Sequence, residues 1–335
     1  MASDRLIYIG AQDGLYQVAT NGGVGEPRLI GLTGMGNVMY PTVDAEDSRR
    51  IYAGTGFGGV FRSEDAGATW QAINEGILFK MIFSVVQHPT TGDLYVGTEP
   101  ASIFKSTNGG DSWTDLPGVR QLRETIDWTF PQPPHVAHVK HIDLASAAPD
   151  RILGAVEEGW VIRTLDGGKT WQNVKEEVEF DSHTVGTFPD DPNQVFATSG
   201  RGFFRSEDGG ASFHPSMDGL SCTYMTNAIV NAKRPNVIVT SAAAVPPPHW
   251  RRGESANAGI FRSENQGKTW RRLTGGLPPE IHTAPRVVAG DPVEPDTFYV
   301  GFMDGTIWRT EDGGEGFRQV IGGLPPVRTM LVTQR

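Results

Sequence analysis

The strongest constraint on the fold of this 335-residue chain is a nine-residue motif that recurs along almost its whole length. The copies share Ser or Thr, Asp or Asn, Gly, Thr or Ser, and a final Trp or Phe at fixed spacing, although Gly316 departs from this pattern. Asp or Asn followed by Gly suits a tight turn with positive φ, so the motif predicts a hairpin rather than an active site. Full copies occupy Arg62–Trp70, Lys105–Trp113, Arg163–Trp171, Arg205–Phe213, Arg262–Trp270 and Arg309–Phe317.

The motif resembles the Asp-box, or bacterial neuraminidase repeat, of sialidases, sortilins, two-propeller xyloglucanases and photosystem II assembly factors. This resemblance covers almost the whole chain and implies a β-propeller. It does not imply one function, because these families share little chemistry. A sialidase would need an arginine trio, a Tyr/Glu nucleophilic pair and an Asp acid. The usual Arg-Ile-Pro signature is absent here, so sialidase activity is not expected.

Short runs rich in Val, Ile, Phe and Tyr, separated by Gly, Pro and Asp turns, indicate an all-β protein around these motifs. Four runs recur in each unit, and seven complete units exist only if the tail Val327–Val332 supplies the first strand that the N-terminal unit lacks. We therefore expect a single domain over residues 1–335. It would be a seven-bladed β-propeller with four-stranded antiparallel blades, closed by the C-terminal strand joining the N-terminal blade.

Two insertions interrupt the repeat. From Ser63 onward the spacing between motifs is 43, 58, 42, 57 and 47 residues, and the two long values place insertions at about 118–139 and 242–258. Up-and-down connectivity puts both on the face opposite the motifs. Their Pro, Trp and Arg residues suit stiff walls that stack on sugars or bind carboxylates, although they could also only cover neighbouring blades. The predicted substrate-binding residues are Arg120, Arg123, Trp128, Asn227, His249, Trp250, Arg251 and Arg286.

Six of the eight histidines fall in the predicted inner strands or in loops of the same face. Imidazoles that converge from separate strands can hold Zn, Mn, Fe or Ni. In a strand, residues three apart point to opposite faces, so His138 does not lie on the side of His135 and His141. We therefore expect His141 and His183 to form the site with His135 or His282 as a third ligand, and His138 to replace His141 if the strand bulges there. A metal-free cluster and a structural role remain alternatives. The candidate ligands are His135, His138, His141, His183 and His282.

Further polar residues belong near the same axis. Asp143 or Glu124 could act as a base or orient a histidine, and Lys140 or Arg286 could pair with a substrate carboxylate. Together these residues predict a metal-dependent lyase or hydrolase that acts on a small polar substrate, including one that contains a carboxylate or a sugar. The alternative is a non-catalytic propeller that binds a protein or a glycan through the same face.

The composition limits the classes of partner and the compartment that we expect for this protein. The chain has 29 Lys and Arg against 39 Asp and Glu, a net charge of −10, which argues against nucleic acid and anionic membranes as partners. Its single cysteine, Cys222, excludes an internal disulfide and fits a reducing compartment, so we expect a cytoplasmic protein. No glycine-rich loop leads into a helix, so no nucleotide cofactor is expected.

Overall fold

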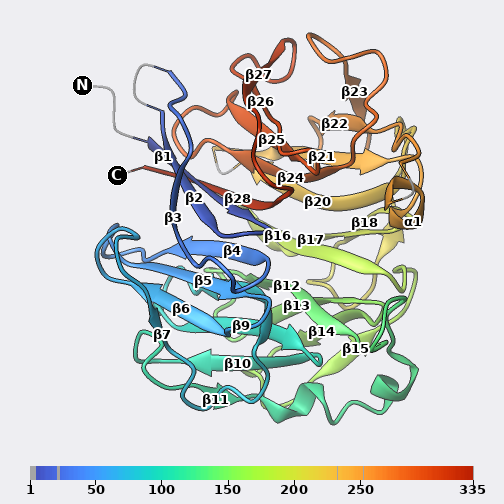
Figure 1. Cartoon of the computed structure of the whole chain (residues 1–335). Helices are drawn as coiled ribbons and strands as arrows, with labels where there is room; N and C mark the ends of the chain where they lie inside the picture. Colours follow the sequence, from blue (N-terminus) through green and yellow to red (C-terminus); the bar gives the residue numbers. More distant parts are fainter. Residues whose placement is uncertain (1–4, 21–22, 232, 252, 335) are drawn as a thin grey trace.

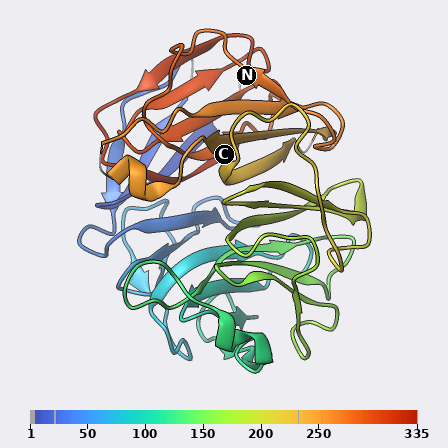
Figure 2. The same ribbon diagram turned by 90° about the vertical axis from the view of Figure 1, so that its right-hand side faces the viewer.

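The chain folds into seven four-stranded antiparallel sheets arranged as the blades of a propeller. We describe it from a computed structural model, in which residues 5–20, 23–231, 233–251 and 253–334 are described, apart from the side chain of Arg251. Figure 2 shows the chain passing around the ring from the blue N-terminal blade through green and yellow to red. The predicted fold is confirmed.

The inner strands form a closed ring, because each contacts the inner strand of the next blade. They are β4 (Val38–Val43), β8 (Met81–Gln87), β12 (His138–Leu144), β16 (Ser182–Phe188), β20 (Tyr224–Asn231), β24 (Pro285–Gly290) and β28 (Val327–Gln334). Each pairs with a second strand of its own blade. These second strands are β1 (Arg5–Ala11), β5 (Ile51–Thr55), β9 (Leu94–Glu99), β13 (Ile152–Glu157), β17 (Asp191–Ser199), β21 (Arg234–Ala243) and β25 (Phe298–Phe302).

The third and outer strands complete the blades, and the outer strands include the shortest in the fold. The third strands are β2 (Leu15–Ala19), β6 (Val60–Ser63), β10 (Ser102–Ser106), β14 (Trp160–Thr164), β18 (Gly202–Ser206), β22 (Gly259–Ser263) and β26 (Ile307–Thr310). The outer strands are β3 (Arg28–Gly31), β7 (Gln71–Ala72), β11 (Thr114–Asp115), β15 (Gln172–Val174), β19 (His214–Pro215), β23 (Arg271–Leu273) and β27 (Phe317–Ile321).

Ring closure mixes the two ends of the chain in one blade. Strand β28 is the inner strand of the blade that contains β1, β2 and β3, and it pairs antiparallel with β1. Ile7, for example, lies opposite Val332. The structure thus confirms that the tail supplies the strand that the N-terminal unit lacks.

Hydrophobic contacts between neighbouring blades form the core. Seven clusters of buried apolar side chains fill the spaces between adjacent sheets. In one of them, Tyr52 and Val60 of one blade pack against Ile82, Val96 and Phe104 of the next. Each large apolar side chain removed from water contributes about 1.5–3 kcal/mol to folding, so the ring is held mainly by these interfaces.

The recurring motif forms the predicted tight turn between the third and outer strands. In the first full copy, Asp65 accepts hydrogen bonds from the Ser63 hydroxyl at 2.8 Å and from the Thr69 backbone N–H at 2.8 Å. The Gly67 N–H donates to the Ser63 hydroxyl, and Gly67 has a φ of 91°, which explains the fixed glycine. The Trp70 indole N–H donates to the Ile30 carbonyl of the preceding blade at 2.8 Å. The motif therefore fastens one blade to the next.

Short helical segments mark the two insertions. The first contains the 3-10 helices η1 (Pro117–Val119) and η2 (Arg123–Asp127), and the second contains α1 (Pro247–Arg251). Figure 2 shows α1 and the helical turns of the first insertion on the face turned to the viewer, whereas the chain termini lie on the opposite side in Figure 1. None of the helical segments in the described part of the chain has the length and apolar character needed to cross a membrane.

Candidate functional site

A ring of displaced residues lies near the start of the inner strands. In β12, Val139 pairs with Val156 and His141 pairs with Ala155, so the ladder skips Lys140. Such a bulge re-aims the side chain of the skipped residue, and bulges are frequent next to active sites. Every inner strand has an irregularity of this kind within its first four residues. The skipped residues, which we call the bulge ring, are Tyr40 with Pro41, Phe83, Lys140, His183, Thr226, Arg286 and Arg328.

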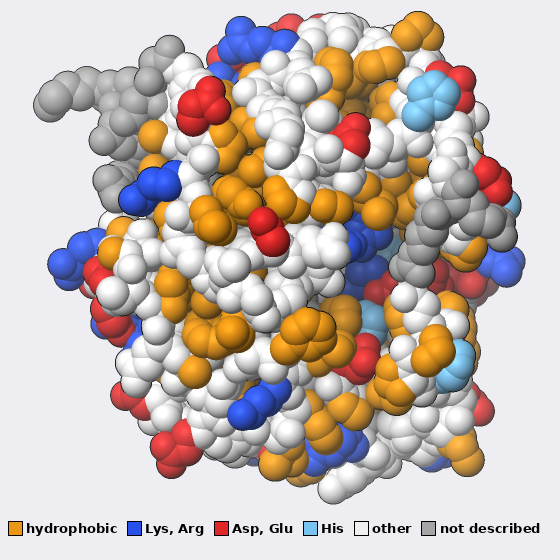
Figure 3. Space-filling model, viewed as in Figure 1, with side chains coloured by type: hydrophobic (Ala, Val, Ile, Leu, Met, Phe, Trp, Pro, Cys, Tyr) orange, Lys and Arg blue, Asp and Glu red, His pale blue; other side chains and the backbone are white. Residues whose placement is uncertain are grey.

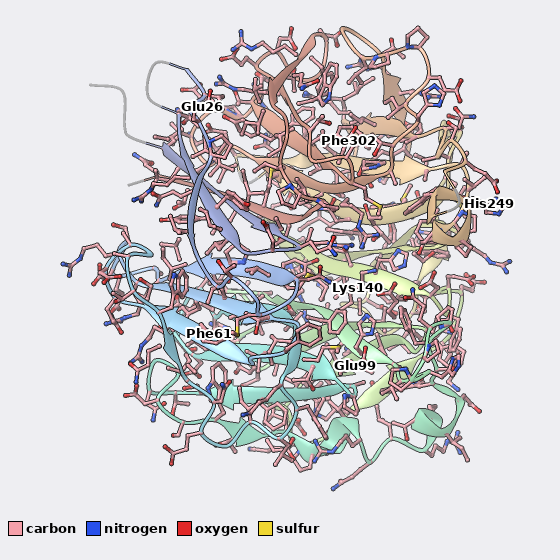
Figure 4. The ribbon with its side chains drawn as sticks, in the orientation of Figure 1. Glu26, Phe61, Glu99, Lys140, His249 and Phe302 are labelled. Atoms are coloured by element: carbon pink, nitrogen blue, oxygen red, sulfur yellow. The ribbon has the colours of Figure 1, made fainter. Side chains whose placement is uncertain are left out.

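Glu157 lies at the centre of a buried polar cluster on this ring. It ends strand β13 and is the cross-strand partner of His138, whose Nε2 donates to Glu157 Oε2 at 2.8 Å. Lys140 Nζ lies 2.8 Å from the same oxygen. The Nδ1 of His138 lies 3.2 Å from Glu99 Oε2, and Phe83 stacks on the imidazole with ring centroids 3.6 Å apart. Figure 4 labels Lys140 and Glu99 on the same part of the molecule.

His183 completes the cluster from the next blade. It is fully buried, and its Nδ1–H donates to the backbone carbonyl of Met225. Its Nε2 faces two carboxylate oxygens, Asp181 Oδ1 at 3.0 Å and Glu157 Oε1 at 3.6 Å. A carbonyl only accepts hydrogen bonds, so the anchored Nδ1 carries a proton. The His183 Nε2 and the two carboxylate oxygens around it therefore form a set of atoms that can bind a metal ion.

Burial and charge oppose each other in this cluster. Burial disfavours the ionised form of Glu157, but Lys140 and the hydrogen bond from His138 outweigh it and hold the pKa of Glu157 well below its usual value. Burial lowers the pKa of Lys140, and Glu157 offsets only part of that shift. For His138, burial favours the neutral ring, yet the Glu157 and Glu99 carboxylates raise the pKa above its ordinary value. Burial and nearby carboxylates also raise the pKa of Glu158.

Both insertions reach the cluster through aromatic side chains. Phe130 of the first insertion packs edge-on against His138, with ring centroids 5.0 Å apart. Trp250 of the second insertion packs edge-on against Tyr224, whose ring lies 5.1 Å from that of His183. Figure 3 shows basic, acidic and histidine side chains close together in a recess beside α1. The insertions thus form apolar walls next to a buried set of charges.

The central channel beside the cluster contains a cavity of about 230 Å³. Tyr40, His141, Arg286 and Arg328 line it from four different blades. Burial lowers the pKa of His141 to about 4, so its ring is neutral near pH 7. His141 contacts the Tyr40 ring edge-on at 5.5 Å. Of the predicted histidines, His138 and His183 both lie beside Glu157, which is the arrangement expected if the strand bulges, and the bulge is at Lys140.

Three other predicted histidines lie away from the cluster. His135 is exposed in the first insertion, where its Nδ1 lies 2.9 Å from a backbone carbonyl. His282 is 72 % exposed and lies 3.5 Å from Glu280. His249 pairs with Glu254 at 2.7 Å, and Figure 4 shows it at the edge of the molecule, far from Lys140. The structure does not bring these three together with His183.

The first insertion holds several predicted residues in local contacts. Arg120 makes a bidentate ion pair with Asp115 and lines a shallow pocket with Trp128 and His135. The guanidinium of Arg123 is 93 % exposed and pairs with Glu124. Arg123 lies on the surface of the insertion, and among the described residues Glu124 forms no hydrogen bond or ion pair with the buried histidines.

Three more predicted residues have separate positions. Asp143 accepts a hydrogen bond from the Thr187 hydroxyl of the next blade at 2.5 Å, and burial raises its pKa. The side-chain amide of Asn227 bonds to the backbone of Val288. Arg251 ends α1, but its side chain lies outside the described part of the structure. Asp143 and Asn227 thus connect neighbouring inner strands.

Glu99, Glu157 and Asp181 were not predicted from the sequence. Glu99 and Glu157 are the last residues of second strands β9 and β13, which end on the face where inner strands begin. Asp181 directly precedes β16. The functional residues predicted from the sequence all lie in inner strands or in loops. An acidic residue at the end of two equivalent second strands was the signal that could have identified this part of the cluster.

Comparisons with known proteins identify the fold. No family model matches the sequence, and no curated protein matches it significantly. An ancestral GH74 enzyme is similar in structure, with a TM-score of 0.66 and 17 % identity over 89 % of this chain and 38 % of its own. The GH74 xyloglucanase from Xanthomonas campestris has a TM-score of 0.66 and 15 % identity over 91 % of this chain and 47 % of its own. This chain therefore spans less than half the length of either enzyme.

A third similar structure is YCF48 bound to D1 peptide. Its TM-score is 0.58 and its identity 17 %, over 85 % of this chain and 81 % of YCF48. At such identities the likeness establishes a shared propeller fold, and the chemistry has to be argued from the residues of this chain.

Proposed function

We propose that this chain is a metal-dependent hydrolase or lyase that acts on a small polar substrate at the insertion-bearing end of the central channel. In this proposal Glu157, Asp181 and His183 bind one divalent transition metal ion. The substrate enters between the two insertions. Lys140 and His138 contact Glu157 on its other side, and in this proposal they supply positive charge and protons to the reaction.

The arrangement of His183 carries this proposal. Its Nδ1–H is fixed by a backbone carbonyl, and a hydrogen bond of this kind orients metal-binding histidines and selects their tautomer. Candidate ligand atoms of Glu157, Asp181 and His183 lie within 4.8 Å of one another. Ligand atoms of a tetrahedral zinc site with bonds of about 2.1 Å lie about 3.4 Å apart, close to the 3.0 and 3.6 Å separations around His183 Nε2.

The chemistry follows from the ligand set and its surroundings. One nitrogen and two carboxylate ligands suit Zn, Mn, Fe or Ni and leave positions for substrate, where the ion would act as a Lewis acid or activate water. Lys140 and His138 occupy Glu157 Oε2 and so leave Oε1 directed at His183. Lys140 also lies where it can give a proton to a leaving group or stabilise negative charge.

Metal analysis of protein purified without a histidine tag tests the proposal. We expect about one ion per chain in the wild type after loading with Zn²⁺ or Mn²⁺ and removal of excess metal. His183→Ala and Asp181→Asn should lose it while circular dichroism shows an intact fold. His214→Ala, which changes an exposed histidine of an outer strand, should retain it. Metal-free wild-type protein whose melting temperature does not respond to either ion would refute the metal site.

A non-catalytic role is the second candidate. It is favoured by the similarity to YCF48 bound to D1 peptide, which extends over most of both chains. In that role the insertions would bind a protein or a glycan, and the buried cluster would only stabilise the channel. Retention of partner binding by His183→Ala, together with absence of metal from the wild type, would support it.

A further inference from the structure

The channel cavity has an unusual charge. Two arginines of the bulge ring, Arg286 and Arg328, line it from neighbouring blades. Within the described part of the chain, none of the residues that line this cavity is an aspartate or a glutamate. The chain as a whole has a net charge of −10, so this local excess of positive charge runs against its overall composition.

Arg286 lacks the partners that a sheltered guanidinium usually has. Its Nε is buried and has no hydrogen-bond partner among the described residues. Arg286 also lies close enough to Lys140 for the two positive charges to repel each other. A guanidinium held beside a second cation, with an unused buried donor, is favoured only if an anion completes the site.

We propose that Arg286 and Arg328 form a seat for the carboxylate of a small ligand in the central channel. The planar fork of a guanidinium binds a carboxylate through two parallel hydrogen bonds. The Tyr40 hydroxyl can donate a further one, and burial raises the pKa of Tyr40 to about 12, so this donor is retained at neutral pH. The ligand therefore enters a site that offers donors on one side.

Size and neighbouring charge select the class of ligand. The cavity of about 230 Å³ is smaller than the roughly 300–1,000 Å³ of sites for drug-sized molecules, so it suits an acid of a few carbon atoms. A phosphate dianion would place more negative charge near Glu157, which forms an ion pair with Lys140. A carboxylate group carries a single negative charge, so it meets less repulsion there, and each arginine can pair with one such group.

If the proposed function is right, this seat identifies the substrate class as a small carboxylic acid. Binding of a carboxylate to the two arginines does not itself depend on the proposed function. Lys140 connects the arginine seat with the metal-binding cluster, because it pairs with Glu157 and lies near the charge of Arg286. A small hydroxy acid or sugar acid could thus place its carboxylate on the arginines and its reacting end at Glu157, Asp181 and His183.

Binding to metal-free protein separates the seat from the metal site. Protein treated with EDTA and dialysed is titrated with succinate and with its uncharged analogue succinamide, using calorimetry and melting temperature as readouts. We expect succinate to bind and succinamide not to bind. Arg286→Met should weaken succinate binding about 10- to 100-fold, which is the loss of a charge-assisted bidentate contact, and Arg286→Lys should weaken it less.

Two controls make the result specific. Arg49→Gln changes an exposed arginine in a turn of another blade and should bind succinate as the wild type does. Arg286→Met should still take up Zn²⁺ or Mn²⁺ if the metal site is real, so failure of one proposal is distinguishable from failure of the other. The seat is refuted if Arg286→Met binds succinate with wild-type affinity, if succinamide binds equally well, or if inorganic phosphate binds and carboxylates do not.

Discussion

The side-chain amide of Asn227 pairs with the backbone of Val288 in the inner strand of the next blade. Its Nδ2 donates to the Val288 carbonyl at 3.1 Å, and its Oδ1 accepts the Val288 N–H at 2.9 Å. The Asn227 amide thus makes the same pair of hydrogen bonds to Val288 that the backbone of a neighbouring strand would make, and it joins two blades. We expect Asn227→Ala to lower the free energy of unfolding by about 2–4 kcal/mol. Two hydrogen bonds are lost, and the backbone N–H and carbonyl of Val288 lose these partners.

Chemical denaturation measures this loss, and metal uptake by the folded variant should stay unchanged. Asn236→Ala is the matched control, since the amide of this exposed residue makes a single bond to the Glu264 carbonyl within its own blade. It should cost about 1 kcal/mol or less. Equal stability of Asn227→Ala and the wild type, with weakened ligand binding, would instead favour the substrate-binding role predicted from the sequence.

The recurring motifs make acid stability depend on individual aspartates. Hydrogen bonds from Thr69 and Ser63 lower the pKa of Asp65 to about 2, against an ordinary value of 3.8. Burial raises the pKa of Asp208, but the same pattern of hydrogen bonds outweighs burial and lowers this pKa to about 2. A folded-state pKa below the unfolded value contributes stability above pH 3.8, and this contribution is lost as the pH falls toward 2. Asp65→Asn with Asp208→Asn should therefore flatten the fall in melting temperature over this range.

The chain contains its own reference for this experiment. Two motifs have asparagine at the same position, and Asn108 accepts the Ser112 N–H as Asp65 accepts that of Thr69. Asn108→Asp should steepen the acid dependence that the double variant flattens. An unchanged pH profile in both variants would mean that these aspartates have the same pKa in the folded and unfolded states.

Much of the fold was predictable because the repeat is local. The hydrogen bonds of its turn join residues two to four positions apart, as in Ser63, Asp65 and Thr69, so each copy specifies one turn without help from the rest of the chain. Counting the strands around these turns left one strand over at the C-terminus. Closure of the ring by β28 then followed from that surplus.

The site was less predictable because its geometry depends on one skipped residue per strand. An ideal strand puts His138 and His141 on opposite sides, and alternation alone cannot show that the bulge at Lys140 changes which of them meets His183. Glu157 reaches the cluster as the cross-strand partner of His138, a relation fixed by register rather than by sequence spacing. The sequence thus predicts which strands carry the site. The carboxylates between these strands could be located only once the pairing of the strands was known.

Four of the six full motifs end in tryptophan, which stabilises the joint between blades where its indole reaches the preceding blade. Trp113 is 5 % exposed, and its N–H donates to the Ile73 carbonyl at 2.7 Å. Trp113→Phe keeps the ring but loses this bond, so we expect a loss of about 1–2 kcal/mol in denaturation experiments. Two motifs carry Phe213 and Phe317 at this position, so the substitution suits the turn. A loss as large as the roughly 3–5 kcal/mol of Trp→Ala would show that ring packing was disturbed as well.

The last prediction concerns closure of the ring. Strand β28 pairs with β1 from Arg5 opposite Gln334 to Ala11 opposite Val327, and it also contacts inner strands β24 and β4 on either side. Removing the residues after Pro325 would expose the edge of β1 and open apolar clusters that include Ile7, Val287 and Met330. An exposed, unpaired strand edge favours aggregation. We therefore expect the truncated chain to lose its cooperative melting transition and to elute in aggregates during size-exclusion chromatography. Adding a synthetic peptide of residues 326–335 should restore part of the folded monomer, and a truncated chain that melts cooperatively as a monomer would show that closure by β28 is dispensable.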